Sequence, residues 1–219
     1  MTLNSNKLPA GGSSIAPLDP GTYPTRLVCV ADLGLQAIPA FQGKEKPPAN
    51  MVAFTYEFVD EFLQDENGED IPDKPRWITE MMSIYHLSSE KAKSTARYNA
   101  LDPSHTYEGD FSKLINTPCM VTVVHNPGKN GKVYTNIAGV TPMREKDANK
   151  CPELVNEAIV FDLDEPSLEL YNQLPGFVQD KIKGGLEHEG SKLYDMLGDA
   201  EEAVEEAPND DLDGDENPY

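Results

Sequence analysis

The sequence has few cysteines and no pattern that would pair them. Cys29, Cys119 and Cys151 are odd in number and widely spaced. This spacing argues against a disulfide framework and suits a reducing cytoplasm. No CxxC pair is present, and the four histidines show no ligand spacing. We therefore expect neither a zinc site nor another cofactor.

Long apolar runs are also missing. The N-terminus lacks the charged-then-apolar order of a signal peptide, and no run approaches the ~20 residues of a membrane-spanning helix. We therefore expect a cytoplasmic protein that has no membrane partner. The sequence also lacks a Walker loop, a Ser or Cys nucleophile motif and carboxylates at metal-ligand spacing. These absences favour a binding protein over an enzyme.

Basic residues are absent from residues 195–219, where nothing balances the acids. This segment carries eleven carboxylates: Asp195, Asp199, Glu201, Glu202, Glu205, Glu206, Asp210, Asp211, Asp213, Asp215 and Glu216. With little to bury, it predicts a disordered, self-repelling arm. The arm ends in Pro218-Tyr219, a compact handle for a basic, apolar pocket on another protein. A plain solubility tail is the alternative interpretation.

The net charge of −20 is unevenly distributed. Residues 1–150 hold eighteen acids and fifteen bases, and the remaining excess of acid lies beyond them. The main body is therefore nearly neutral, and local clustering is enough to give it a basic groove.

The order of elements follows from hydrophobic period and turn residues. Strands are expected over 21–36, 51–62, 76–86, 118–125 and 132–141. A helix is expected over 88–101, capped by Ser88 or Ser89 and stopped by Asp102-Pro103. Asn67-Gly68 predicts a hairpin turn. The resulting divisions are an irregular lead-in over 1–20, a β domain over 21–142, a helical extension over 143–194 that packs on it, and the arm.

The expected order of elements is three strands, a helix and two further strands, which is the order of the OB-fold. We therefore predict a mainly β protein, a five-stranded Greek-key barrel with a helix between strands 3 and 4. Such barrels bind ligands on strands 2 and 3 and with the loops that join strands 1 to 2 and 4 to 5. A five-stranded sandwich without a binding face remains the alternative.

Basic and aromatic residues fall where this barrel would need them. Single-stranded nucleic acid requires cations for its phosphates and rings for its bases. The candidates are Phe41, Lys44, Lys46, Tyr56, Arg76, Trp77, Tyr85, Lys129, Lys132 and Tyr134. A strand aromatic is more often a core residue, and we assign Phe54 and Phe58 to the core. Lys91, Lys93 and Arg97 fit a flanking phosphate track or, with greater weight, a solvated helix face.

Taken together, the acidic arm and the basic groove predict a mechanism in which the arm competes with ligands for the groove. A tethered polyanion occupies the groove at high effective concentration and competes with weak ligands. A long single strand displaces it and frees the Pro-Tyr end for partner proteins.

The end of the chain resembles a known family. Asp210-Asp-Leu-Asp-Gly-Asp-Glu-Asn-Pro-Tyr219 is similar to the C-terminus of acidic-tailed single-stranded DNA-binding proteins of bacteria and phages. The body segments 9–13, 19–23, 43–50 and 125–132 resemble tailed-phage replication proteins of that kind. The family commonly ends in Phe, whereas this chain ends in Tyr.

The resemblance implies a protein that coats single strands during phage replication or recombination in the host cytoplasm. Its tail would contact a polymerase, a helicase-primase or a recombinase through Asp211, Asp213, Asp215, Glu216, Pro218 and Tyr219. A homodimer is compatible with these features. Two alternatives stay open: a strand-annealing recombination protein, and an acidic DNA mimic that inhibits a host protein.

Overall fold

The structure is a computed structural model that describes residues 17–128 and 133–205. The chain forms two compact units, Met1–Ala31 with Met51–Val160 and Asp32–Asn50 with Phe161–Tyr219. We call them the first and second units. The end of the first long strand and the loop after it thus group with the C-terminal helices.

The protein is mainly β, with a six-stranded antiparallel open sheet and a few helices. The strand order is β3-β2-β1-β4-β5, and β6 pairs with β1 off this path. The elements in chain order are β1 (Gly21–Gln36), β2 (Ala49–Gln64), β3 (Asp70–Ser83), α1 (Lys93–Leu101), η2 (Phe111–Leu114), β4 (Pro118–Pro127), β5 (Val133–Pro142), α2 (Glu145–Ala148), β6 (Ile159–Phe161), α3 (Leu168–Gln173), α4 (Gly176–Lys183) and α5 (Lys192–Glu205).

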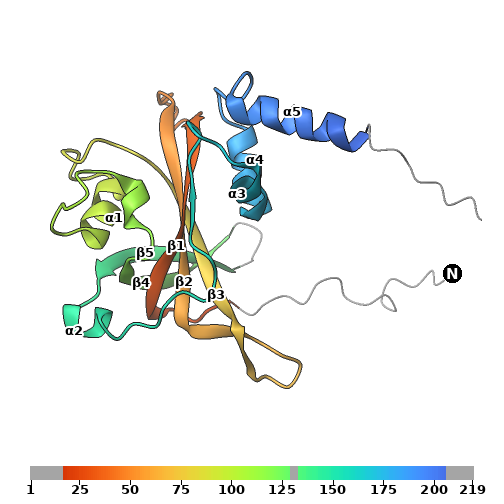
Figure 1. The fold of residues 1–219 in the computed structure, drawn as a ribbon. Helices are drawn as coiled ribbons and strands as arrows, with labels where there is room; N and C mark the ends of the chain where they lie inside the picture. The colour runs from red at the N-terminus through yellow and green to blue at the C-terminus, as the bar shows by residue number, and fades with distance from the viewer. Residues whose placement is uncertain (1–16, 129–132, 206–219) are drawn as a thin grey trace, which may run out of the picture. The chain divides into compact units, whose positions relative to one another are not determined.

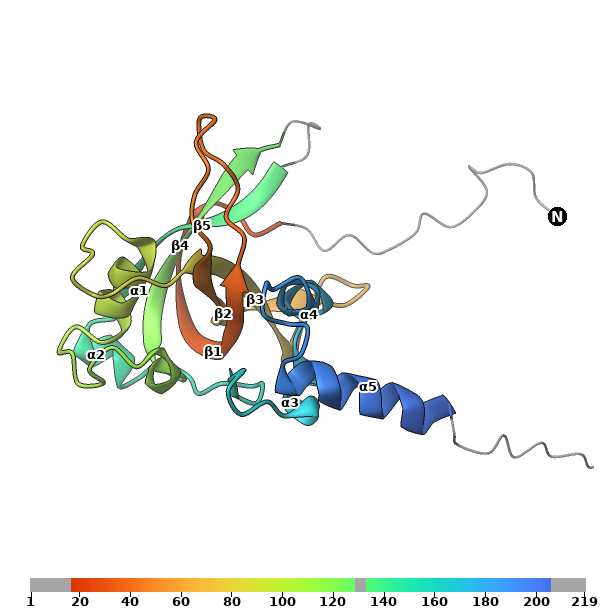
Figure 2. The same cartoon turned by 90° about the horizontal axis from the view of Figure 1, so that it is seen from above.

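Alternation along the strands builds the core of the first unit. Phe54, Tyr56 and Phe58 of β2 are fully buried, as are Val121 and Val123 of β4. In both Figure 1 and Figure 2, α1 lies beside β4. Its one aromatic ring, that of Tyr98, meets the rings of β2 in the core through Phe111 of η2, whose centroid is 5.2 Å from Tyr98 and 5.9 Å from Phe54.

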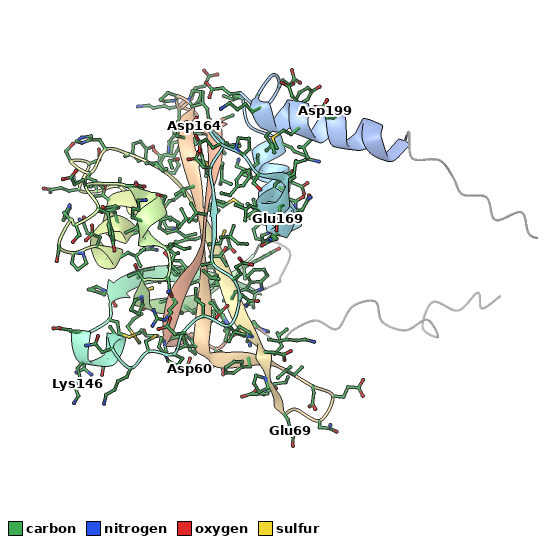
Figure 3. The ribbon with its side chains drawn as sticks, viewed as in Figure 1. Asp60, Glu69, Lys146, Asp164, Glu169 and Asp199 are labelled. Carbon is green, nitrogen blue, oxygen red and sulfur yellow. The ribbon has the colours of Figure 1, made fainter. Side chains whose placement is uncertain are left out.

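The β2–β3 hairpin turns at the predicted Asn67-Gly68 pair. Gly68 has a φ of 82°, a left-handed conformation that glycine adopts without steric cost. Asp65 closes the turn, since its Oδ1 accepts hydrogen bonds from the backbone N–H groups of Asn67 at 2.8 Å and Glu69 at 3.0 Å. Figure 3 shows Glu69 at the far end of this hairpin and Asp60 nearer the rest of the sheet.

The helix α1 begins later than the sequence predicts. Residues 88–92 form turns, in which Ser89 N–H donates to His86 O and Ala92 N–H to Ser89 O, both at 2.8 Å. The N-cap is Ala92, and it makes no side-chain cap. The predicted cap at Ser88 or Ser89 is therefore wrong. The predicted end is right, because Asp102 is the C-cap residue.

The second unit is built from the end of β1, the loop after it and helices α3, α4 and α5. Gln36 Nε2 donates to Leu33 O at 2.6 Å and to Lys181 O at 3.0 Å, which ties β1 to α4. Tyr171, Val178, Ile182 and Leu193 form its buried apolar side. Phe177, the residue before Val178, is exposed instead.

Helix α5 corrects the predicted boundary of the arm. The acidic composition from Asp195 onward predicted no regular structure, yet α5 runs from Lys192 to Glu205. Leu193 at its start is fully buried and provides an anchor. The Pro-Tyr end of the arm, with Asp211, Asp213, Asp215, Glu216, Pro218 and Tyr219, lies outside the described residues.

Candidate nucleic-acid interface

The largest exposed ring of the first unit belongs to Trp77 on β3, and 56% of the residue's surface is exposed. Trp77 lies opposite Glu57 of β2, and Thr79 lies opposite Thr55. The hydroxyls of the two threonines are 2.8 Å apart. Since directly paired residues point to the same side of a sheet, Trp77, Thr79 and these partners share one face. A flat apolar ring beside polar groups is suited to a nucleic-acid base.

Two further candidates of the first unit are also exposed. Tyr134 of β5 lies opposite Asn126 of β4 and is half exposed. Tyr85, which follows β3, is half exposed as well, and its backbone N–H donates to Ser94 Oγ at 3.2 Å. Lys129 and Lys132, predicted beside Tyr134, lie outside the described residues. The first unit therefore carries three of the predicted rings on its surface.

In the second unit, a tight turn brings three predicted residues together. Phe41 and Lys44 exchange both of their backbone hydrogen bonds at 3.0 Å. Gln42 and Gly43 between them have φ values of 51° and 75°, as a two-residue hairpin turn of type I′ requires. Lys46 Nζ lies 5.0 Å from the centroid of the Phe41 ring, within cation–π range.

This turn presents a ring and two cations to solvent, because Phe41 is 60% exposed. The turn itself needs only the four residues 41–44.

Arg76 differs from its neighbour Trp77 because it lies among carboxylates. Burial, followed by Asp60, raises the pKa of Glu61, whereas Arg76 lowers it. Arg76 likewise lowers the pKa of Tyr23, which burial and three nearby carboxylates raise. The charge of Arg76 is thus partly used within the protein.

Tyr56 does not offer a stacking face, which corrects the prediction. The residue is fully buried, and its hydroxyl donates to Glu80 Oε1 at 3.0 Å. Burial and the adjacent Glu80 carboxylate raise its pKa well above the usual value. Its alternation with Phe54 and Phe58 places it with them in the core.

The proposed basic track along α1 is also corrected. Arg97 is buried, and its Nε and Nη2 donate to the two Glu80 carboxylate oxygens at 2.7 and 3.1 Å. Lys93 Nζ lies 2.7 Å from Glu80 Oε2. Two of the three cations therefore neutralise one buried acid, and Arg97 lies neither on a solvated face nor on a phosphate track.

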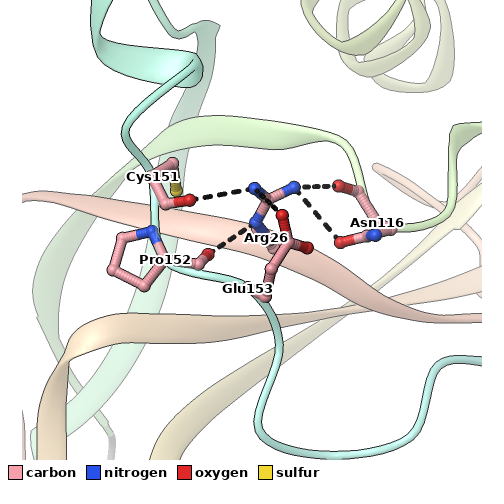
Figure 4. A network of polar contacts seen from close by, with 5 residues as sticks. All are labelled: Arg26, Asn116, Cys151, Pro152 and Glu153. Atoms are coloured by element: carbon pink, nitrogen blue, oxygen red, sulfur yellow. Dashed lines mark hydrogen bonds and ion pairs between the residues drawn. The ribbon is translucent and has the colours of Figure 1, made fainter.

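Sequence reasoning missed the role of the segment 151–158, which we call the strap. Arg26 of β1 holds its start, as Figure 4 shows. The guanidinium donates to Pro152 O at 2.7 Å, Cys151 O at 3.0 Å and Asn116 O at 2.8 Å, and it is 3.2 Å from Glu153 Oε1. These carbonyls satisfy a cation that is almost fully buried.

Glu57 of β2 holds the other end of the strap. Its carboxylate accepts hydrogen bonds from Val155 N at 2.7 Å, Asn156 N at 3.2 Å and Asn156 Nδ2 at 2.6 Å. Glu57 is also the cross-strand partner of Trp77. The strap therefore passes the face that carries Trp77, and it presents Val155, which is half exposed. An acid between Tyr56 and Phe58, two aromatic residues of one strand, was the one signal of this contact.

The thiols offer little nucleophilic chemistry. Burial raises the pKa of Cys29 and of Cys119 to about 12. Cys151, at the start of the strap, is half buried, and burial raises its pKa even though Arg26 opposes the shift. Among the side chains that the structure describes within residues 17–128 and 133–205, no group of three His, Cys, Asp or Glu is placed to hold a metal ion. No helix in those ranges has the length and apolar character to cross a membrane.

The structure therefore groups the sequence candidates into two sets. Trp77, Tyr85 and Tyr134 are exposed on the first unit, and Phe41, Lys44 and Lys46 meet at one turn of the second. The chain matches no protein-family model, and comparisons with curated proteins and with solved structures give no match either.

Proposed function

We propose that this protein binds single-stranded DNA without sequence preference and coats it during phage DNA replication or recombination. The observation that carries the proposal is Trp77, an indole more than half exposed on a sheet face. Base–aromatic stacking is worth about 1–3 kcal/mol per base, and it tolerates any sequence because every base has a π-face. The proposed activity is binding in the cytoplasm, without catalysis.

The connectivity supports an OB-fold. An OB barrel opened between its third and fifth strands has the neighbour order β3-β2-β1-β4-β5, which is the order found here. The helix α1 lies between β3 and β4 in the chain, and β3 and β5 lie near each other. In such a barrel, Trp77 belongs to the ligand face, and Phe41, Lys44 and Lys46 belong to the loop between the first two strands.

The arm has two roles in this proposal. Its carboxylates compete with weak ligands for the cationic groups of the interface, and its Pro218-Tyr219 end contacts a polymerase, a helicase-primase or a recombinase. The structure refines the test, because α5 continues to Glu205. A truncation should therefore remove residues 206–219 and leave that helix intact.

Trp77 is the only tryptophan of the chain, so its fluorescence reports on the site directly. We expect an oligo-dT to quench it in dilute salt, with an affinity that falls steeply as salt rises. By anisotropy of a labelled oligo-dT, Trp77→Ala should weaken binding about 5- to 150-fold, the equivalent of 1–3 kcal/mol. Tyr194→Ala removes another half-exposed ring and is the matched control.

Removal of residues 206–219 should tighten oligo-dT binding. A protein that ignores oligo-dT in dilute buffer, with and without those residues, would refute the proposal and favour a DNA mimic. Accelerated pairing of complementary strands would identify an annealing protein instead. Equal losses from Trp77→Ala and Tyr194→Ala would remove Trp77 from the interface.

A further inference from the structure

A pocket of the first unit lies apart from the residues proposed to contact DNA. It has a volume of about 420 Å³. Its apolar walls come from Pro24 of β1, Val59 of β2, Met120 of β4 and Met143, which follows β5. All of these residues are half buried. Methionine side chains adapt their shape to a ligand, so the walls suit a narrow chain of methylene groups.

The polar rim of the pocket is acidic and only partly neutralised. Asp147 of α2 is paired, since its Oδ2 lies 2.6 Å from Arg144 Nη2. Asp60, across the pocket, has no cation within salt-bridge distance among the described residues. Glu61 and Asp19 add two negative charges nearby and Arg76 adds one positive charge, because all three act with Asp60 on Tyr23, and the balance stays negative.

The position of Asp60 makes this charge more significant. Asp60 is exposed, but its carboxyl lies at the edge of the apolar walls, and partial burial there raises its pKa. Figure 3 shows it near the end of the sheet. A carboxylate that has lost part of its hydration and lacks a counter-ion gains most from a cation that brings its own apolar stem.

We propose that this pocket receives an arginine side chain of a partner protein. The methylene stem would lie against Met120 and Met143, and the guanidinium would bind Asp60. Arginine suits the site because long basic side chains bury their stems along apolar surfaces. Its planar head also donates two hydrogen bonds to one carboxylate. The charges of the rim would repel phosphate, which separates this pocket from the DNA interface in function.

The methionine methyl groups make the pocket observable by NMR. With ¹³C-methyl-methionine protein, n-butylguanidinium should shift the Met120 and Met143 signals, with a dissociation constant on the order of 10 mM for so small a probe. The substitutions Met120→Leu and Met143→Leu assign the two signals. Guanidinium lacks the stem, butanol lacks the charge and butyrate reverses it, so each should shift them far less.

The variant Asp60→Asn should weaken n-butylguanidinium binding at least about fivefold. Glu69→Gln, which removes an exposed acid from the same hairpin, should leave it unchanged. The peptide acetyl-Gly-Arg-Gly-amide should shift the same two methyl signals. Equal shifts with butanol or butyrate, or binding that survives Asp60→Asn, would overturn the proposal. So would binding of n-butylguanidinium but not of the peptide, which would indicate a site for a small cation. None of these outcomes depends on whether the protein binds DNA.

Discussion

Glu57 and Glu80 are buried carboxylates on neighbouring strands, and they face opposite sides of the sheet. Glu80 lies opposite Phe54 on the core face, and Glu57 lies opposite Trp77 on the other. Glu80 is held by Arg97, Lys93 and the Tyr56 hydroxyl. Glu57 accepts its hydrogen bonds from two backbone N–H groups and one amide of the strap.

The different partners of Glu80 and Glu57 give the two buried carboxylates different roles. At Glu80 opposite charges meet in the core, so the loss of one partner leaves an unpaired charge in a medium of low dielectric constant. At Glu57 neutral donors hold the acid, so its loss leaves three unsatisfied donors on a segment that can move to solvent. We therefore expect the first site to govern the stability of the fold and the second to govern the strap beside Trp77.

The largest expected effect is that of Glu80→Ala. Removal of one partner of a buried ion pair costs about 3–5 kcal/mol, and chemical denaturation should show a loss of that size. Addition of Arg97→Met should restore much of the stability, because replacing both partners by apolar groups is often neutral. A loss below about 1 kcal/mol in Glu80→Ala would mean that Arg97 reaches solvent in that variant.

Glu57→Ala should have a smaller and more local effect. We expect a loss of about 1–3 kcal/mol, the cost of unsatisfied buried donors, and faster hydrogen exchange at the amides of Val155 and Asn156. The affinity for oligo-dT should change with it, because the strap borders the face of Trp77. If hydrogen exchange instead becomes faster at all amides along β2, Glu57 supports the sheet as a whole. Its role would then not differ from that of Glu80.

Acid should weaken the Glu80 site. Burial alone would raise the pKa of Glu80, but the hydrogen bonds and charges of Arg97 and Lys93 outweigh it and hold that pKa below the usual value. A carboxyl with a lowered pKa stabilises the fold above its unfolded value of about 4.3. This contribution is lost as the pH falls through the folded pKa. The double variant Glu80→Ala/Arg97→Met should therefore lose less stability below about pH 4 than the parent protein does.

The smallest effect is expected for Glu153→Gln. The carboxylate is 3.2 Å from Arg26, but its side chain is 79% exposed, and such pairs contribute roughly 0–1 kcal/mol. The carbonyl oxygens of residues 116, 151 and 152 should hold Arg26 without it. A loss as large as that of Glu57→Ala would show that charge, rather than carbonyl acceptors, fixes this end of the strap.

Local patterns predicted β1, β2, β4 and β5 well, but β3 begins six residues before its predicted start, β6 was missed, and the polar contacts were predicted poorly. β1 occupies the predicted range, and β4 and β5 end within two residues of theirs, because strand residues and turn residues alternate sharply there. Tyr56 was retained as a stacking candidate although its spacing places it with Phe54 and Phe58. Its partner Glu80 lies on another strand, and the register that joins them cannot be obtained from either strand alone.

Prediction of the candidate site has the same limit, because local patterns do not reveal contacts between segments far apart in the sequence. Exposed Trp77 and the cluster of Phe41, Lys44 and Lys46 follow from residue type and position in the chain. The strap does not, because Arg26 and Glu57 reach it across 125 to 127 and 98 to 99 residues of sequence. Helix α5 was missed because composition reports charge along the segment and not the buried anchor at Leu193.

The three thiols also bear on how the protein can be labelled. At neutral pH a group with a pKa of about 12 has a thiolate fraction on the order of 10⁻⁵, so Cys29 and Cys119 should resist maleimides and mild oxidants. Cys151 is only half buried, so a reagent can reach its sulfur, although burial raises its pKa despite the nearby Arg26. A fluorophore or spin label should therefore attach to the unaltered chain at Cys151, where it would report from the edge of the strap without the removal of any native cysteine.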